Sequence, residues 1–489
     1  SVLASVRESL LEDVMTEMFG QSFPYRFGDR FGKIHAFVTA GTSVSVTGLS
    51  THDRGELAGS SKTFAGDGVA SAATDTSDVT WGNTVVGGQI DHRSSRLPLR
   101  VQLVGGWSGA DNTFGPPDAP TRVSEIESVD AALHADLLLD WPVRLGGTRR
   151  ATTLAYALAG QFEQPDEAAE ATLTEWTAYA ETDVRAGSVT ITPGLHAFHL
   201  SERNETGVEP RLRVTWRPAE PVRIDVAAGR YHQAIAGVND QRDVGSVFTA
   251  WIPMPTTDPL PTATHVVAGS SVQIQPWLSV AAEAFWKQYD ELAVPFFTAF
   301  PRFNTRLQPA EGDAIGLDLR ADFDGYPFLY ESALDGYVSY GLSRVEYRSP
   351  QATYPPPHDR RHQFNAVLRA TRGDVGLTVQ LQAGSGLPFT PSGGFDRWYP
   401  FDPSRDVTTA QGDVRVLYGE PFSSRQPAYQ RVDVWLEHRF EQGRIAGALR
   451  GGVINLLNRK NLFYFDLFTL QRVDQLPLTP SVGIKLEVR

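Results

Sequence analysis

Two histidines, His196 and His199, are the first residues in this sequence whose type and spacing suggest a metal site. They lie three residues apart in a segment with strand-like alternation, so their side chains point to opposite faces and do not share one ion. The segment 28–33 has the glycines and lysine of a phosphate-binding loop, but it is one residue short and no Ser or Thr follows Lys33. No Gly-x-Ser-x-Gly turn marks a nucleophile, although Ser, His and Asp are abundant. We therefore expect neither an enzyme, nor a metal site, nor a cofactor.

Aromatic side chains beside arginines in long segments are the better candidates for function. Such groups suit the capture of a sugar, peptide or siderophore by stacking and charge. The alternative is that they pack loops against each other or form the aromatic girdle of a membrane protein. These candidates lie on segments 235–263, 295–311 and 391–427 and at the entry to the first of them: Tyr231, His232, Gln233, Arg242, Trp251, Phe296, Phe297, Arg302, Arg397, Trp398 and Tyr399.

The elements that position these residues are strands, because apolar and polar residues alternate with a period of two. In segment 211–217, Leu212, Val214 and Trp216 share one face, and arginines and Thr215 occupy the other. The same alternation returns at 222–226, 431–437 and 484–488. Charged groups on one face and apolar groups on the other need two different surroundings. A soluble sandwich offers core and water, whereas a large barrel offers lipid and a wet lumen.

The lengths of the connections favour the barrel. The first set of connections (such as 40–41, 218–221 and 373–374) is very short, with 324–333 as its one longer member. The alternate set includes 9–24, 55–76, 235–263, 295–311 and 391–427, with 203–207 as its one short member. One rim of tight turns and one rim of long loops is the layout of outer-membrane barrels, with the turns periplasmic and the loops extracellular. The pattern predicts about 20 strands at 1–8, 25–39, 42–54, 77–93, 97–111, 123–142, 149–164, 173–187, 189–202, 208–217, 222–234, 264–275, 278–294, 312–323, 334–348, 360–372, 375–390, 428–440, 444–462 and 476–488.

Composition agrees with an all-β transmembrane barrel. No run of 18 apolar residues exists, and a mean hydropathy of -0.24 is compatible with strands that turn only alternate residues toward lipid. The chain has no cysteine, which excludes disulfides, thiol catalysis and cysteine-based zinc sites. Its net charge of -13 argues against nucleic acid as a partner.

Several segments, in order along the whole chain, resemble the barrel of TonB-dependent receptors, particularly the carboxypeptidase-regulatory-like group common in Bacteroidetes-type bacteria. Each segment alone is a weak signature, and the ordered set is a strong one. The segments that carry the resemblance are Ser1–Leu10, Pro24–Asp29, Trp81–Asn83, Glu209–Leu212, Gly336–Arg344, His358–Asn365, Ser385–Pro391, Tyr429–Asp433 and Val453–Asn461.

The resemblance implies a 22-strand antiparallel barrel of which residues 1–489 supply the third to the last strand. Two strands and an N-terminal plug domain with its TonB box are then expected upstream, and the first and last strands of this chain are not expected to pair. The implied function is that of a receptor in the bacterial outer membrane, in contact with lipid and lipopolysaccharide. The extracellular loops would capture a small-molecule, peptide or glycan ligand. The inner-membrane TonB complex would energise uptake through the plug, and a surface lipoprotein is a further conceivable partner.

Two rival functions fit the same pattern: a passive porin-like channel, and a structural barrel that holds partner proteins at the cell surface. The charged faces of the strands also have two interpretations. One is a solvated wall whose charges pair across strands, and the other is a wall that grips a plug through salt bridges. The residues concerned are Arg211, Arg213, Arg217, Arg223, Asp225, Arg431, Asp433, Glu437 and Arg439.

Overall fold

The computed structural model of the chain describes residues 1–9, 25–57, 62–65, 68–71, 77–116, 118–159, 166–239, 243–245, 247–297, 305–399, 413–443, 445–467, 470 and 472–488. One sheet of 22 strands dominates these residues. No helix in the described residues is long and apolar enough to cross a membrane.

Two of the 22 strands are short segments, β11 (Val184–Ala186) and β22 (Thr353–Tyr354), which leaves 20 long strands, as the sequence predicts. The long strands are β1 (Val2–Glu8), β2 (Tyr25–Thr39), β3 (Thr42–Leu57), β6 (Ser77–Arg93), β7 (Leu99–Gly115), β8 (Arg122–Leu137), β9 (Val143–Leu158), β10 (Glu167–Thr182), β12 (Val189–Leu200), β13 (Glu205–Ala219), β14 (Val222–His232), β18 (Thr262–Gln275), β19 (Leu278–Pro295), β20 (Leu307–Pro327), β21 (Ala333–Arg348), β23 (His362–Arg372), β24 (Val375–Gly384), β29 (Tyr429–Gln442), β30 (Ile445–Ile454) and β33 (Thr479–Val488).

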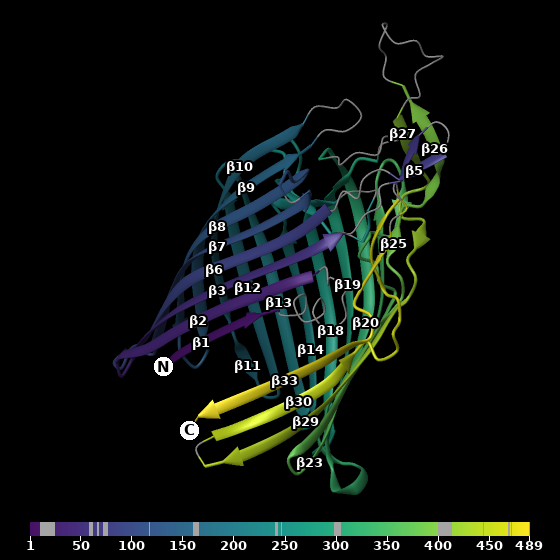
Figure 1. Cartoon of the computed structure of the whole chain (residues 1–489). Coiled ribbons are helices and arrows are strands. Elements are labelled where there is room, and N and C mark those ends of the chain that lie inside the picture. The colour runs from purple at the N-terminus through teal and green to yellow at the C-terminus, as the bar shows by residue number, and fades with distance from the viewer. Residues whose placement is uncertain are drawn as a thin grey trace.

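Each long strand pairs antiparallel with the next one along the chain, so the sheet is an uninterrupted meander that curves into a barrel wall (Figure 1). One rim carries short connections such as 40–41 and 373–374. The longer connection predicted on this rim, 324–333, contains the 3-10 turn η1 (Leu329–Glu331). The alternation of short and long connections is therefore confirmed.

Small separate sheets lie in the long connections at the other rim. They are β4 (Lys62–Ala65) with β5 (Gly68–Ser71), β15 (Ile235–Asn239) with β17 (Thr249–Pro253), β16 (Asp243–Val244) with β31 (Leu462–Asp466) and β32 (Arg472–Asp474), β25 (Pro388–Phe389) with β28 (Ser424–Arg425), and β26 (Ser392–Trp398) with β27 (Asp413–Tyr418).

Two predicted strands, 149–164 and 173–187, were placed about six residues too late. The structure starts β9 at Val143 and β10 at Glu167, and the turn before β9 lies at 138–142. The connection predicted at 143–148 is part of β9. Gly146 instead lies within the sheet, opposite His134 and Tyr179, whose ring nitrogen and hydroxyl are 3.0 Å apart. A Cβ at Gly146 would come within 2.3 Å of the Tyr179 ring, so the glycine serves close packing and not a turn.

The outer face of the wall is apolar and uncovered. Leu212, which is 46% exposed, and Val226 point outward, as predicted, and alternate with charged residues that line the lumen. The buried apolar side chains gather instead at the long-loop end, where loops fold against the inner wall. A wall without an apposed second sheet excludes the soluble sandwich.

The first and last strands do not pair with each other. In the described residues β1 pairs only with β2, and β33 pairs only with β30. This confirms the prediction that the chain does not close into a 20-strand barrel by a continuous ladder. That two further strands and a plug lie upstream stays a prediction.

Candidate ligand-binding rim and lumen

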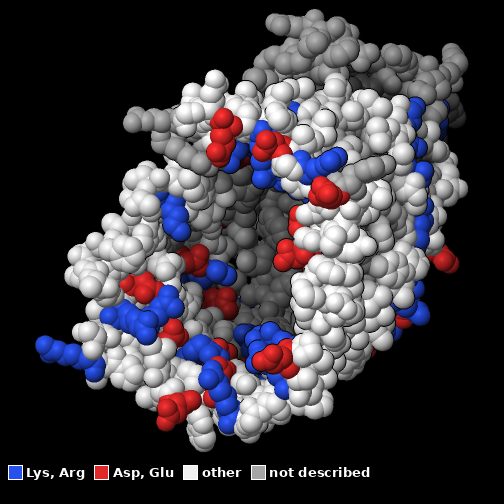
Figure 2. Space-filling view, turned by 90° about the horizontal axis from the view of Figure 1, so that it is seen from below, with Lys and Arg blue, Asp and Glu red and all other residues white. Residues whose placement is uncertain are grey.

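The inner wall of the barrel is charged, and many of its charges form ion pairs. Figure 2 looks into the hollow end of the barrel and shows acidic and basic side chains around the opening, while much of the outer wall is free of charge. Arg223 lies 2.6 Å from Asp225, and Arg431 lies 2.8 Å from Asp433. Glu437 accepts from guanidinium groups on β23 and on its own strand. Of these contacts, the pairs on β14 and β29 join residues two apart on one strand, and the contact of Glu437 with Arg369 crosses strands. The wall is thus charged and internally paired, and that it also grips a plug stays a prediction.

One recess in this wall keeps unpaired positive charge. It has a volume of about 530 Å³ near the short turns, and Arg185, Arg213 and Arg217 line it. None of these three guanidinium groups has an acidic partner within 4.0 Å among the described residues. Asp183, which also lines the recess, is held by Arg144 at 2.9 Å. The recess therefore suits an anionic group.

The long connection 233–261 folds across the mouth of the barrel. Its strand β17 packs against β8, β9 and β10, while β15 contacts β19, five long strands further along the wall. The backbone N–H of Trp251 donates to Ser124 Oγ on β8 at 3.1 Å. Further along, Val244 pairs with Phe465, and Val247 packs beside Val79. Because its contacts are on separated parts of the wall, this connection bridges the lumen.

One face of the hairpin β15–β17 is buried and the other is open. Ala236, Val238 and Ile252 face a wall that includes Phe198 and Leu200. On the opposite face, Trp251 is 38% exposed. Trp251 is thus a predicted binding residue that the structure leaves accessible, whereas Arg242 lies outside the described residues.

The entry to this connection is held by a buried network of charged and aromatic side chains. His232 Nδ1 lies 2.7 Å from Glu209, its Nε2 lies 3.3 Å from Glu175, and its ring stacks on Phe198 at 3.5 Å. His196 Nδ1 lies 2.8 Å from Glu209 as well. The side chain of His232 is only 9% exposed. It is therefore placed to fix the base of the hairpin rather than to touch a ligand.

The neighbours of His232 are also engaged in local contacts. Tyr231 packs under the guanidinium of Arg211 at 4.8 Å, and Gln233 donates to the carbonyl of Ile235 at 2.6 Å. These contacts place Tyr231 and Gln233 next to the network, away from the other predicted binding residues.

In a second cluster, side chains from three long connections pack against one another. The backbone N–H of Phe297 donates to Gln351 at 2.8 Å, and its ring contacts Tyr354 at 5.1 Å and Phe422 at 6.1 Å. Phe296 lies under the Arg306 guanidinium at 5.1 Å. Phe296 and Phe297 thus act in loop packing, the alternative considered for them above.

The carboxylate of Asp359 anchors this loop cluster to the barrel. Its side chain is fully buried. It accepts from Arg425 Nη2 at 2.5 Å and from the backbone N–H of Val345 at 2.9 Å, and Arg361 Nη2 lies 3.6 Å away. Two guanidinium groups therefore share one carboxylate.

The loop cluster should loosen in acid because of His358. Burial lowers the pKa of this imidazole, against a smaller opposing effect of Asp359. Stability is therefore full above the unfolded pKa of about 6.5 and falls as the pH drops below it, since the opened loop takes up the proton first. The protection factors of residues 349–361 against hydrogen exchange, corrected for the intrinsic exchange rate at each pH, should fall as the pH drops from about 7.5 to about 5. His358→Gln should remove this pH-dependent loss of protection, and exposed His438→Gln should not. Equal behaviour of the two variants would contradict the prediction.

The remaining predicted residues lie on or near a separate hairpin. Arg397 and Trp398 belong to β26, and the exposed Tyr399 follows it. β26 pairs only with β27 in the part of the chain that the structure describes, and the hairpin lies at the far tip of the long-loop rim (Figure 1). Arg302 falls outside the described residues. The predicted residues therefore occupy several groups on one rim, and the structure does not bring them into a single pocket.

Sequence reasoning missed the two buried anchors, Glu209 and Asp359. Glu209 occurs in a segment that resembles a strand entry of the family, and Asp359 occurs in another family-like segment. No local pattern shows that either carboxylate is buried. His196 and His199 do lie on opposite faces: His196 approaches Glu209, while His199 contacts Thr206 at 3.0 Å. Within the described ranges, no cluster of His, Cys, Asp and Glu could hold a metal.

Comparison with solved structures decides the kind of barrel. The chain superposes on the ferric yersiniabactin uptake receptor FyuA of Yersinia pestis with a TM-score of 0.62 at 12% identity, over 100% of this chain and 74% of that one. It matches the ferric-catecholate import receptor Fiu of Escherichia coli K12 with a TM-score of 0.63 at 9% identity, over 95% and 75% of the two chains. The chain has the fold of a TonB-dependent receptor barrel.

The outer-membrane transporter YddB of Escherichia coli is also similar, with a TM-score of 0.58 at 8% identity, over 99% of this chain and 79% of that one. All three similar structures are named as transporters or receptors. No family model matches the sequence, and no curated protein matches it significantly. At these identities the likeness concerns the fold, which is the outer-membrane barrel that the sequence predicted.

Proposed function

We propose that this chain is the barrel of an outer-membrane receptor that captures a ligand at its long-loop rim and passes it inward with energy from the TonB complex. The observation that carries the proposal is the shared barrel over almost the whole chain with proteins named as uptake receptors. The bridging connection 233–261 supports it, because a lumen crossed near its mouth needs a driven rearrangement before a large ligand can pass.

The proposed ligand is a small molecule, a peptide or a glycan. It would be bound by basic side chains of the rim together with exposed aromatic ones such as Trp251 and Tyr399. Coupling to TonB would act through a plug domain. A surface lipoprotein over the loops would favour a glycan as ligand. The charged inner wall and the basic recess at Arg213 and Arg217 offer a hydrated path below the mouth.

The rival is a passive channel, and energy dependence separates the two. Cells expressing the full-length protein would be given a labelled ferric catecholate complex, an oligosaccharide and a short peptide, with and without a functional TonB complex. We expect uptake of one of these probes to need both the TonB complex and the proton gradient. It should also be lost when the hairpin β26–β27 is removed. Uptake that continues at the same rate without TonB would establish a passive channel instead.

A further inference from the structure

The basic recess near the short turns is built by the register of three neighbouring strands. Arg185 of β11, Thr190 of β12 and Thr215 of β13 lie opposite one another in one row across the sheet. Arg213 and Arg217 lie two residues to either side of Thr215 on β13, so their side chains point to the same face, which is the lumen face of the wall. Three guanidinium groups therefore surround one row of hydroxyl groups.

The carboxylates beside this row are bound by other arginines. Asp183 accepts two hydrogen bonds from Arg144, at 2.9 and 3.0 Å, and one from the Thr192 hydroxyl at 2.7 Å. Asp225 accepts a hydrogen bond from Arg223 at 2.8 Å. Together with Glu181, which Arg144 also contacts, the recess and the groups bonded beside it hold five arginines and three carboxylates. A net charge of two positive therefore remains, and within the described residues it lies on the arginines of the recess.

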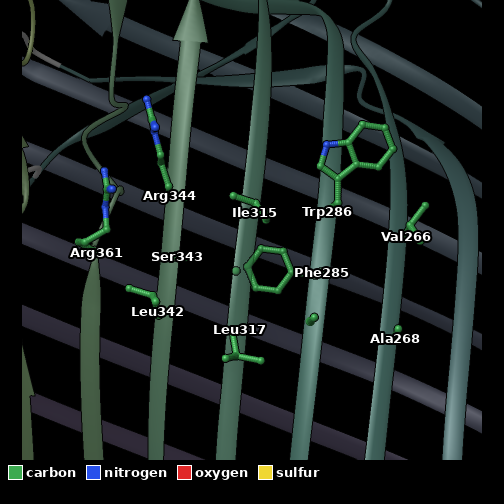
Figure 3. A pocket seen from close by; sticks show the side chains of 12 residues that line it. Val266, Ala268, Phe285, Trp286, Ile315, Leu317, Leu342, Ser343, Arg344 and Arg361 are labelled. Carbon is green, nitrogen blue, oxygen red and sulfur yellow. The ribbon is translucent and has the colours of Figure 1, made fainter.

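A second recess, the outer recess, shows that arginines in this wall normally have acidic partners. It lies on the outer face across β18, β19, β20 and β21 (Figure 3). One row across these four strands runs Val266, Trp286, Ile315 and Arg344. Arg344 and Arg361, which line the outer recess, have carboxylate partners at 2.7 and 3.6 Å. The basic recess differs in having three guanidinium groups without such a partner in the described part of the chain.

The spacing of the arginines indicates which kind of anion fits the basic recess. Arg213 and Arg217 are four residues apart on one strand, so their Cα atoms are about 13 Å apart, and Arg185 approaches from the other side of the row. The volume of about 530 Å³ is in the range of small-molecule sites. A carboxylate offers two oxygens in one plane, whereas a diphosphate offers terminal oxygens on two linked tetrahedra. Guanidinium groups bind phosphate oxygens in a bidentate manner, so separated arginines favour the diphosphate.

We propose that the basic recess binds a solute that carries a diphosphate group. Arg213 and Arg217 each hold one of the two phosphates, and Arg185 contacts the diphosphate from β11. The short turns are periplasmic in barrels of this layout, so the site lies at the periplasmic end of the lumen. It goes beyond the proposed uptake function, because it depends neither on the long-loop rim nor on energy from TonB.

The test is binding of pyrophosphate to the full-length protein in detergent, measured by isothermal titration calorimetry, with inorganic phosphate for comparison. We expect pyrophosphate to bind more tightly than phosphate, and its affinity to fall as the salt concentration rises. Arg213→Gln or Arg217→Gln should each weaken binding about tenfold, the effect of losing one charge-assisted hydrogen bond. Asp183→Asn should strengthen binding, because it removes a negative charge from the lining.

The matched control is Arg372→Gln, because Arg372 is an exposed arginine at the same rim that does not line the recess. This variant should bind pyrophosphate as the unmodified protein does, and heat-modifiable mobility in gel electrophoresis reports whether each variant is folded. An equal loss in Arg372→Gln, or equal affinity for phosphate and pyrophosphate, would overturn the site.

Modification by phenylglyoxal, located by mass spectrometry, shows directly which arginines the anion covers. Pyrophosphate should protect Arg213 and Arg217 from the reagent and leave Arg372 reactive. If Arg213 and Arg217 were unreactive before pyrophosphate is added, carboxylates of the protein itself would fill the recess, and the proposal would be wrong. Because both measurements are made without energy coupling, their failure is distinguishable from failure of the proposed uptake.

Discussion

Shortening the connection 233–261 so that the hairpin β15–β17 is lost should open the barrel mouth to large molecules. The hairpin buries Ala236, Val238 and Ile252 against the inner wall. Burial of a side chain such as valine or isoleucine contributes roughly 1.5–3 kcal/mol. Two such side chains therefore favour the closed over the open form by a population ratio of about a hundred or more. The closed form should therefore dominate in the native protein.

The absence of cysteine from the chain makes this directly measurable, because Thr177→Cys supplies a single thiol on the inner wall. Thr177 pairs with Phe198, which packs against the hairpin. A bulky, membrane-impermeant maleimide added outside intact cells should label Cys at this position slowly, and about a hundredfold faster after the hairpin is removed. Removing the hairpin β26–β27 instead should leave the rate unchanged. A rate that is insensitive to both deletions would mean that the connection does not close the mouth.

Replacing Asp359 by alanine should release the loop cluster while the barrel still folds. The change removes the acceptor of the Val345 N–H and leaves Arg425 and Arg361 without their shared carboxylate. The loss of a buried charged partner costs about 3–5 kcal/mol, and partial exposure of Arg425 reduces this to about 2–4 kcal/mol.

The expected readout is faster proteolysis within 349–361 and 385–428, together with faster hydrogen exchange of the Val345 amide. Exposed Asp374, in a turn at the opposite rim, provides the control, and Asp374→Ala should change neither quantity. Unfolding of the whole barrel by Asp359→Ala would show that the loops stabilise the wall, contrary to this expectation.

The sequence by itself determined the strands, their order and the face that each side chain takes. Alternation with a period of two is local, so Leu212 and Arg213 are assigned to opposite faces as soon as their segment is a strand. The lengths of the connections then separate the two rims. Where this reasoning failed, at β9 and β10, the predicted connection contains Gly146, whose place within the sheet depends on His134 and Tyr179 from neighbouring strands.

Only the tertiary structure decided what the long connections do. The hairpin β15–β17 has the same alternation as a wall strand, but it folds into the lumen because apolar residues of β10 and β12 lie within its reach once the barrel has curved. Asp359 is buried because segments more than 60 residues apart supply Arg425. The outer recess likewise depends on rows that cross four strands, and a row exists only after the register of every pair is set. A period-2 pattern assigns a side chain to a face, whereas contact between distant segments follows from the curvature and register of the whole sheet.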